Sequence, residues 1–143
     1  MKKIVDLNKV IHQEIPPPAC DVSLGIKISE AYEGYAKGYW NIKDHLLNGN
    51  GVVMGGFVSA AADIIMAYAM TTRLNEHQTF ASINLDTTFH RPVFTGKVEI
   101  EAAIKKLGKS IAYVQAVLTQ NEKRVADAVS SIIIMQKETN IKT

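Results

Sequence analysis

One long uncharged run constrains this chain more than any other feature. From residue 51 to residue 72 the sequence holds a single charged side chain, Asp63, among Ala, Val, Ile, Met, Gly and hydroxyl residues. The run is too long for one buried strand, and the pair Gly55 and Gly56 is typical of a loop that turns into a helix. We therefore predict a helix over residues 57–73 that is apolar nearly all round and buried on most sides.

Asp63 is the unusual residue of this helix. An isolated buried charge is costly, so a carboxylate in such surroundings must be hydrogen-bonded, paired or shifted in pKa. It is either a catalytic group or a structural aspartate that caps a loop or pairs across a subunit interface. A membrane-spanning helix is disfavoured, because the run contains Asp63 and lacks flanking basic or aromatic anchors.

Composition sets limits on the class of protein. The chain has 143 residues, enough for one domain over residues 1–143, and a net charge of only +2, which predicts no general affinity for nucleic acid or membrane surfaces. A lone cysteine, Cys20, excludes an intrachain disulfide framework, and the start of the chain lacks an uninterrupted apolar signal segment. We expect a cytoplasmic protein. The histidines and Cys20 lack ligand spacing, so no metal site is predicted.

The order of the remaining elements predicts an α+β fold. A short N-terminal helix is expected at about residues 2–14, ended by three prolines, and a polar tail at about 137–143 is expected to be frayed. Alternating apolar residues predict a hairpin from strands at 22–30 and 35–42. After the central helix we expect four strands in meander, at about 80–94, 97–107, 110–120 and 124–136. The result is an antiparallel sheet of about six strands around one long central helix.

Several short motifs narrow this fold class further. They are Asn48 with Met54-Gly55-Gly56 and Asp63, the run 82–89 with Arg91, Pro92 and Gly96, and the turn Leu107-Gly108-Lys109-Ser110. In this order and spacing the chain, over about residues 22–135, resembles acyl-CoA thioesterases of the phenylacetate-degradation (PaaI) type, in the 4-hydroxybenzoyl-CoA thioesterase superfamily. The resemblance implies the hotdog fold.

The resemblance also implies an activity and a mode of assembly. The expected reaction is hydrolysis of a thioester of coenzyme A to a free carboxylic acid and CoA, with CoA as part of the substrate and no other cofactor. Members pair edge to edge into homodimers, often then into homotetramers, and each site draws on both members of a pair. The apolar final strand, with Ile132 to Met135, weakly supports such pairing, since an exposed apolar edge strand would promote aggregation.

The resemblance assigns roles to five catalytic candidates. Asp63 is expected to attack the thioester or to act as general base for a water. The backbone N–H groups of Gly55 and Gly56 are expected to stabilise the oxyanion, although two glycines also simply permit a tight helix entry. Asn48 is expected to hold the carbonyl or the water, although an Asn-Gly pair alone is more often a turn. Ser82 is expected to hold water, but a strand serine is equally often uninvolved.

The substrate-binding candidates are basic residues and one methionine. Arg91, Lys105 and Lys109, with Lys106 and Ser110 beside them, form the basic grouping expected to meet CoA phosphates, although most such charges are simply solvated. Met54 is expected either to line the acyl pocket or to fill the core. The family usually has histidine there, and a thioether neither donates a hydrogen bond nor carries a proton. This departure motivates an alternative function, an acyl-CoA-binding sensor or regulatory module without turnover.

Overall fold

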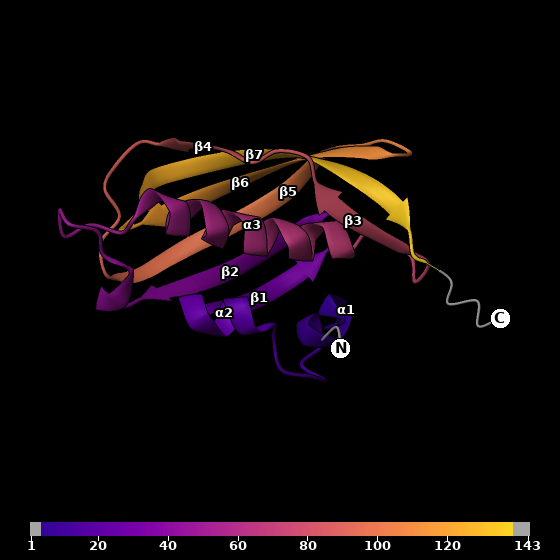
Figure 1. The fold of residues 1–143 in the computed structure, drawn as a ribbon, viewed down its shortest axis with the longest axis horizontal. Helices are drawn as coiled ribbons and strands as arrows, with labels where there is room; N and C mark the ends of the chain where they lie inside the picture. The colour runs from indigo at the N-terminus through magenta and orange to yellow at the C-terminus, as the bar shows by residue number, and fades with distance from the viewer. Residues whose placement is uncertain (1–3, 139–143) are drawn as a thin grey trace.

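A curled antiparallel sheet packs around one long helix, α3 (Gly55–Thr71), in the computed structural model, which describes residues 4–138 (Figure 1). This confirms the predicted α+β architecture. The strands are β1 (Ile26–Tyr32), β2 (Tyr35–Ile42), β3 (Gln78–Ser82), β4 (Asp86–Phe89), β5 (Gly96–Leu107), β6 (Ile111–Gln120) and β7 (Lys123–Gln136). Short helices α1 (Leu7–Ile11) and α2 (Ala19–Leu24) precede β1, and a 3-10 helix, η1 (Asp44–Leu46), follows β2.

The strand order is β1-β2-β5-β6-β7-β3, and β4 also pairs with β7. Ser82 of β3 lies opposite Ile132, and Asp86 of β4 lies opposite Val129, so β3 and β4 act as one interrupted edge strand. This arrangement gives six positions across the sheet, as predicted. The predicted meander is correct for β5, β6 and β7 but wrong for residues 78–89. These residues pair with β7 and not with β5. A loop rather than a hairpin turn connects β4 to β5, and β5 pairs with β2 instead.

Two other expectations also need correction. The apolar end of β7 is not a bare edge, because Ile132 to Met135 all pair with β3, and Ile132 and Ile133 also pair with β6, so this segment gives no argument for a partner. The strand predicted from Val22 begins only at Ile26, because α2 occupies Ala19–Leu24. Gly25 ends α2 in the left-handed conformation, with φ of 84°. The N-terminal helix is shorter than predicted, and most of the predicted frayed tail lies outside the described residues.

Helix α3 packs tightly onto the sheet. Its buried residues face the sheet and include Val58, Ala62, Ile65 and Met66. At Gly38 of β2 the approach is so close that an added Cβ would stand 2.4 Å from Cδ1 of Ile65. Only glycine fits there, and the space between helix and sheet is filled by side chains.

A buried polar contact fixes α2 to α3. The side chain of Asp21 is 2% exposed, and the hydroxyl of Tyr68 donates a hydrogen bond to its Oδ2. Burial raises the pKa of the Asp21 carboxyl group, and the hydrogen bond from Tyr68 partly opposes this effect. A buried carboxylate without such a donor would be strongly destabilising, so the pair belongs to the packing of the N-terminal segment.

Candidate active site

One side of α3 faces the interrupted edge strand, and three contacts follow each other along it. The ring of Phe89 lies against Gly55, where an added Cβ would stand 3.0 Å from Cζ. The Ser59 hydroxyl donates to Oγ1 of Thr87 at 2.7 Å. One turn further on, the Asp63 carboxylate meets the Ser82 side chain. Helical residues four apart share a face, so Gly55, Ser59 and Asp63 line the same groove.

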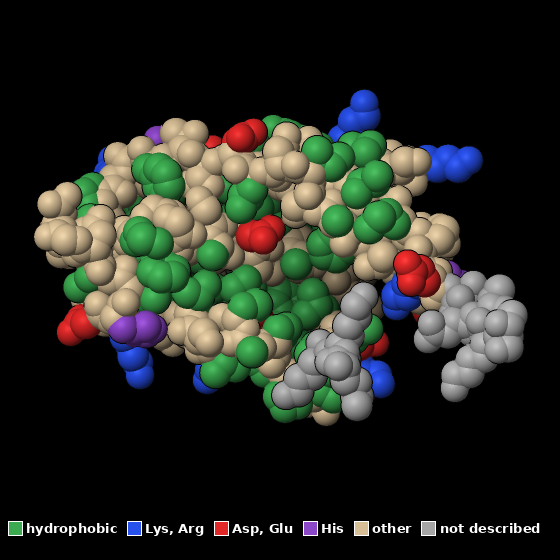
Figure 2. Space-filling model, in the orientation of Figure 1, with side chains coloured by type: hydrophobic (Ala, Val, Ile, Leu, Met, Phe, Trp, Pro, Cys, Tyr) green, Lys and Arg blue, Asp and Glu red, His purple; other side chains and the backbone are tan. Residues whose placement is uncertain are grey.

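The Asp63 carboxylate is solvent-accessible in the single chain but crowded by neighbouring atoms. Desolvation raises its pKa, and the Ser82 hydroxyl partly opposes this by hydrogen bonding. Figure 2 shows that this face of the molecule, over α3, carries mostly hydrophobic and uncharged side chains. A carboxylate in such surroundings is more basic than usual, which suits a group that takes a proton from water.

The start of α3 has backbone donors without partners. Met54 is the N-cap residue, and its side chain makes no capping hydrogen bond. The Phe57 N–H donates to the Met54 carbonyl, whereas the N–H groups of Gly55 and Gly56 donate to no acceptor within residues 4–138. A hollow of about 350 Å³ opens beside them, lined by Val52, Val53, Gly55, Val58, Phe89, His90, Arg91, Pro92 and Val93. These free donors, with the positive end of the helix dipole, can hold an oxyanion.

Gly55 and Asp63 are too far apart to act on one atom within a single chain. Eight residues of α-helix separate them by about 12 Å, at 1.5 Å per residue. A reacting carbonyl must lie about 3 Å from both the oxyanion donors and the attacking group. The single chain therefore does not bring the Gly55 N–H group and the Asp63 carboxylate to one reacting atom.

Asn48 shapes the loop that precedes α3. Its Oδ1 accepts hydrogen bonds from the backbone N–H of Asn50 at 2.9 Å and of Val52 at 3.3 Å. The turn considered for this residue is therefore present. Its Nδ2 group, the only donor of the side chain, stays available for another partner.

Met54 lies over the first turn of α3 and not in the core. Its side chain is 45% exposed, and its Cε would be 3.2 Å from a Cβ added to Gly56. Of the two positions considered for it, core filling is wrong. The side chain forms an apolar wall next to the free N–H groups.

The basic candidates do not gather at one place. Arg91 lines the hollow at the start of α3, and its Nη1 donates to the carbonyl of Arg124 at 2.8 Å. Lys109 and Ser110 line a second hollow, of about 380 Å³, that also includes Lys106 and Tyr113. This turn comes just before Ala112. In the sheet, Ala112 shares a row with Ile132 and Ser82, which places Ala112 about 10 Å from Ser82 at the usual strand spacing.

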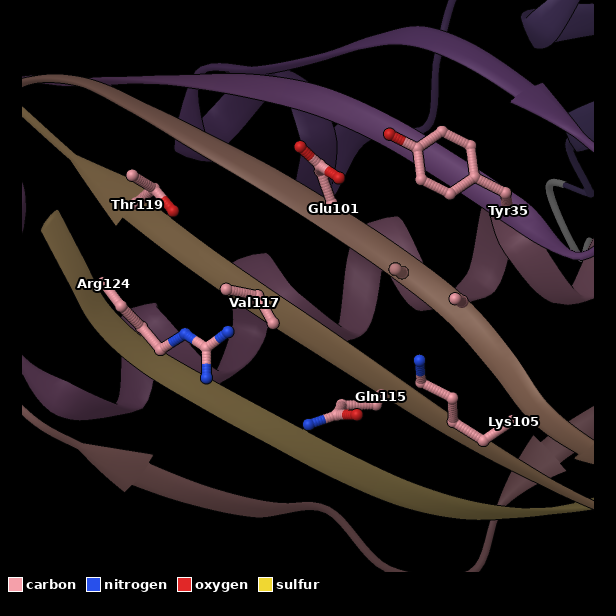
Figure 3. A pocket seen from close by; sticks show the side chains of 9 residues that line it. Tyr35, Glu101, Lys105, Gln115, Val117, Thr119 and Arg124 are labelled. Atoms are coloured by element: carbon pink, nitrogen blue, oxygen red, sulfur yellow. The ribbon is translucent and has the colours of Figure 1, made fainter. Parts of the chain in front are cut away.

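Lys105 lies on the outer face of the sheet, away from α3. Figure 3 shows it at a hollow of about 240 Å³ together with Tyr35, Glu101, Gln115 and Arg124. Neighbouring residues of β6, such as Val114 and Ala116, point the other way into the core. The single chain therefore does not bring Lys105 to the groove of Asp63.

Sequence reasoning missed three residues of the groove. Ser59 and Thr87 form the hydrogen bond between α3 and β4, and Phe89 covers Gly55. The spacing of four residues between Ser59 and Asp63 was a usable signal, because such residues share a helix face. Phe89 belongs to the motif run 82–89, but its contact with Gly55 could not be predicted from the sequence, since this contact depends on how β4 pairs with β7.

No group of three or more His, Cys, Asp and Glu side chains within residues 4–138 is placed to hold a metal ion. In the same part of the chain, no helix has the length and hydropathy needed to cross a membrane.

A curled antiparallel sheet around one long central helix defines the hotdog fold. The model of the thioesterase superfamily matches residues 50–126, which is more than half of the chain. This chain belongs to the thioesterase superfamily.

Solved structures agree with this assignment. A phenylacetic acid degradation-related protein from Ralstonia eutropha JMP134 is 27% identical, with a TM-score of 0.84, over 90% of this chain and 99% of that one. The PaaI protein of the Escherichia coli phenylacetic acid degradation operon is 26% identical, with a TM-score of 0.76, over 82% and 85%. A Haemophilus influenzae thioesterase is 23% identical, with a TM-score of 0.82, over 99% and 98%, and shows the fold alone.

Proposed function

We propose that this protein is an acyl-CoA thioesterase that hydrolyses a CoA thioester to a carboxylic acid and free CoA. The main support is Asp63, a carboxylate of raised pKa that lies in the groove between α3 and the free edge strand. Membership of the thioesterase superfamily supports the thioester as the bond that is cleaved. Arg91, at the hollow beside Gly55, and Lys109, at a separate surface hollow, favour an acyl carrier with phosphate groups.

In the proposed reaction, the Asp63 carboxylate takes a proton from a water while the water oxygen attacks the thioester carbon. The carbonyl oxygen becomes an oxyanion that accepts hydrogen bonds from the N–H groups of Gly55 and Gly56. When the tetrahedral intermediate collapses, the C–S bond breaks and the proton on Asp63 passes to the leaving sulfur. Asn48, through Nδ2, and Ser82 orient the carbonyl and the water.

A second route starts with attack of the Asp63 carboxylate itself on the thioester carbon. CoA then leaves first, and water hydrolyses the resulting mixed anhydride. Single-turnover reactions in ¹⁸O-labelled water distinguish the routes by mass spectrometry of the protein. Label in the Asp63 carboxylate indicates the anhydride, because direct attack of water on the thioester leaves both oxygens of that side chain unlabelled.

The proposed enzyme is a homo-oligomer, a dimer or a dimer of dimers. The separation of about 12 Å between Gly55 and Asp63 along α3 requires that the two come from different copies. A symmetric pair then holds two sites, each with Asp63 from one chain and the glycine donors from the other. The exposed thiol of Cys20 fits a reducing, cytoplasmic location.

The CoA part of the substrate is proposed to meet Arg91 and the turn with Lys109 and Ser110. Both line hollows at the surface, where a cation contacts phosphate at little desolvation cost. Lys105 has the weakest support of this group, because it lies on the outer face of the sheet.

Release of free thiol from a panel of short, long and aromatic acyl-CoA thioesters tests the proposal. Asp63→Asn keeps the size of the side chain and removes the base, so kcat should fall by about 10²–10⁴-fold. Asp6→Asn is a matched control, because asparagine can still cap α1 and lies outside the groove. No thiol release from any substrate by the wild type, or full activity of Asp63→Asn, would contradict the enzyme.

An acyl-CoA-binding module without turnover is the second candidate, and Met54 favours it. Binding of the same thioesters without thiol release would support this candidate. Met54→His restores the family's usual imidazole beside Gly56. Met54→His should raise the rate of thiol release if the site still has room for the imidazole and lacks only that group. An unchanged or lower rate would show that the site is rebuilt around methionine.

A further inference from the structure

The hollow beside Gly55 has walls from two segments of the chain. One is the segment that leads into α3, with Val52 and Val53, and the other is residues 89–93, where the loop from β4 to β5 begins. The N–H group of Val53 donates to the carbonyl of Val93 at 2.9 Å, and both side chains are buried. This hydrogen bond joins the two walls. A shift of Val93 therefore moves the backbone that enters α3 and carries the free N–H groups.

Gln120, the last residue of β6, holds the loop next to Val93. Its side chain is only 6% exposed. Its Nε2 donates to the carbonyl of Phe94 at 2.8 Å, and its Oε1 accepts from the N–H group of Phe94 at 3.0 Å. One buried side-chain amide thus pairs with both backbone polar groups of one residue, as a neighbouring strand would. Because unpaired buried polar groups are costly, this pair fixes the loop firmly.

The other end of this loop is fixed to β7 by backbone groups. The N–H groups of His90 and Arg91 donate to the carbonyl of Val125, at 2.8 and 3.1 Å. These attachments lie two or more residues before Val93, whereas Phe94 follows Val93 directly. The amide pair is therefore the attachment nearest in sequence to the hydrogen bond that joins the two walls.

We propose, on the basis of the proposed function, that Gln120 is a positioning residue for the oxyanion donors at the start of α3. The Gln120 amide sets the place of Phe94, the adjoining Val93 carbonyl sets the place of Val53, and Val53 leads into α3. Gln120 itself touches no reacting atom. Oxyanion donors act in the transition state, so their displacement lowers kcat and leaves KM nearly unchanged.

Thiol release by Gln120→Met tests this role. Methionine has nearly the length of glutamine but cannot pair with the Phe94 backbone as the amide does. We expect kcat to fall by about 10-fold or more and KM to stay within about 2-fold, because a misplacement of about 1 Å can cost up to 10²-fold. Gln136→Met is the control, since Gln136 is exposed at the far end of β7, and it should keep both constants.

Gln120→Glu adds a readout that a general loss of stability would not give. A protonated carboxyl group accepts from the Phe94 N–H group and donates to the Phe94 carbonyl, as the amide does, whereas a carboxylate cannot donate. The kcat of Gln120→Glu divided by that of the wild type should therefore fall as pH rises and the new group ionises. The ratio removes the effect of pH on Asp63, which both proteins share. A ratio that is independent of pH overturns the inference, also where Gln120→Met fails to fold.

Amide hydrogen exchange, followed by NMR, separates this inference from the enzymatic function. In Gln120→Met, the Val53 N–H group should exchange about 10-fold faster or more, because its acceptor on Val93 is released, whereas the Val114 N–H group in the middle of β6 should stay within about 2-fold of wild type. That result supports the placement of the start of α3 by Gln120 even if the wild type releases no thiol, which would overturn only the enzyme.

Three results overturn the inference while thiol release by the wild type still supports the enzyme. The first is unchanged exchange at Val53 in Gln120→Met. The second is equal acceleration at Val53 and Val114, which indicates a general loss of stability. The third is a kcat of Gln120→Met equal to that of the wild type.

Discussion

The phenyl ring of Phe89 lies against the α-carbon of Gly55, so that a Cβ there would stand 3.0 Å from Cζ and 3.3 Å from Cε1. Gly55→Ala must therefore move the ring or the helix start that carries the proposed oxyanion donors. Because a misplacement of about 1 Å can cost up to 10²-fold, we expect kcat to fall by about 10-fold or more.

The control for Gly55→Ala is Gly49→Ala, whose added Cβ would meet nothing within 4 Å. It should keep wild-type activity. Thermal unfolding of Gly55→Ala should stay close to wild type, since alanine is no worse than glycine in a first helical turn. The same is expected for Gly49→Ala, which lies in a turn and adds no steric clash. An active Gly55→Ala enzyme would show that the ring position is unimportant for the reaction.

A capping side chain at position 54 should increase stability and reduce activity. Met54 leaves the helix start uncapped, whereas Met54→Asp places an acceptor within reach of the Gly56 or Phe57 N–H. We expect the free energy of unfolding to rise by about 0.5–2 kcal/mol and kcat/KM to fall, because the aspartate occupies donors that the oxyanion needs. Urea denaturation and thiol release measure the two effects. A variant that is more stable and equally active would argue against the donor role.

The pH profile should report the raised pKa of Asp63. Water attack needs the ionised carboxylate, so kcat/KM falls as pH drops through this pKa, and the fall should begin above the ordinary aspartate value of about 3.9. Ser82→Ala removes the hydrogen bond that lowers the pKa, so its acid limb should move to still higher pH. Ser23→Ala, on α2, serves as control. If the acid limb of the pH profile moves to lower pH in Ser82→Ala, the contact between Ser82 and Asp63 is contradicted.

Tyr68→Phe should destabilise the protein in a pH-dependent way. It leaves Oδ2 of the buried Asp21 carboxylate without its donor, while the Cys20 thiol still donates to Oδ1, and the loss costs about 1–3 kcal/mol. Loss of the donor raises the pKa of Asp21 further above its unfolded value. The loss in free energy of unfolding is therefore largest above this pKa, where Asp21 is ionised, and it decreases as pH falls through the pKa. Urea denaturation at several pH values, with the exposed Tyr32→Phe as control, should show this slope; equal losses at every pH would rule it out.

Local patterns in the sequence predicted the central elements well. The helix expected at 57–73 is found at Gly55–Thr71, and the strand expected at 35–42 is found at Tyr35–Ile42. Both rest on periodicity that holds within one element. The strand expected from Val22 failed because the apolar alternation crosses a boundary between helix and strand. Pro18 before α2 and Gly25 after it were the available signals.

Long-range contacts could not be predicted in the same way. Asp21 and Tyr68 are 47 residues apart, and their hydrogen bond depends on how α2 docks onto α3. Ser59 and Thr87 meet only because β4 pairs with β7 and not with β5. Asp63 and Gly55 were recognisable as candidates from the motif, but their roles remain predictions until activity is measured.

The close approach of Ile65 to Gly38 has a consequence for evolution and for design. At this contact the acyl chain of the proposed substrate has no path between α3 and β2. In the proposed enzyme, a change of acyl selectivity therefore comes from residues around the Asp63 groove or from a shorter side chain at position 65. The second change opens a cavity under the helix and lowers the free energy of unfolding.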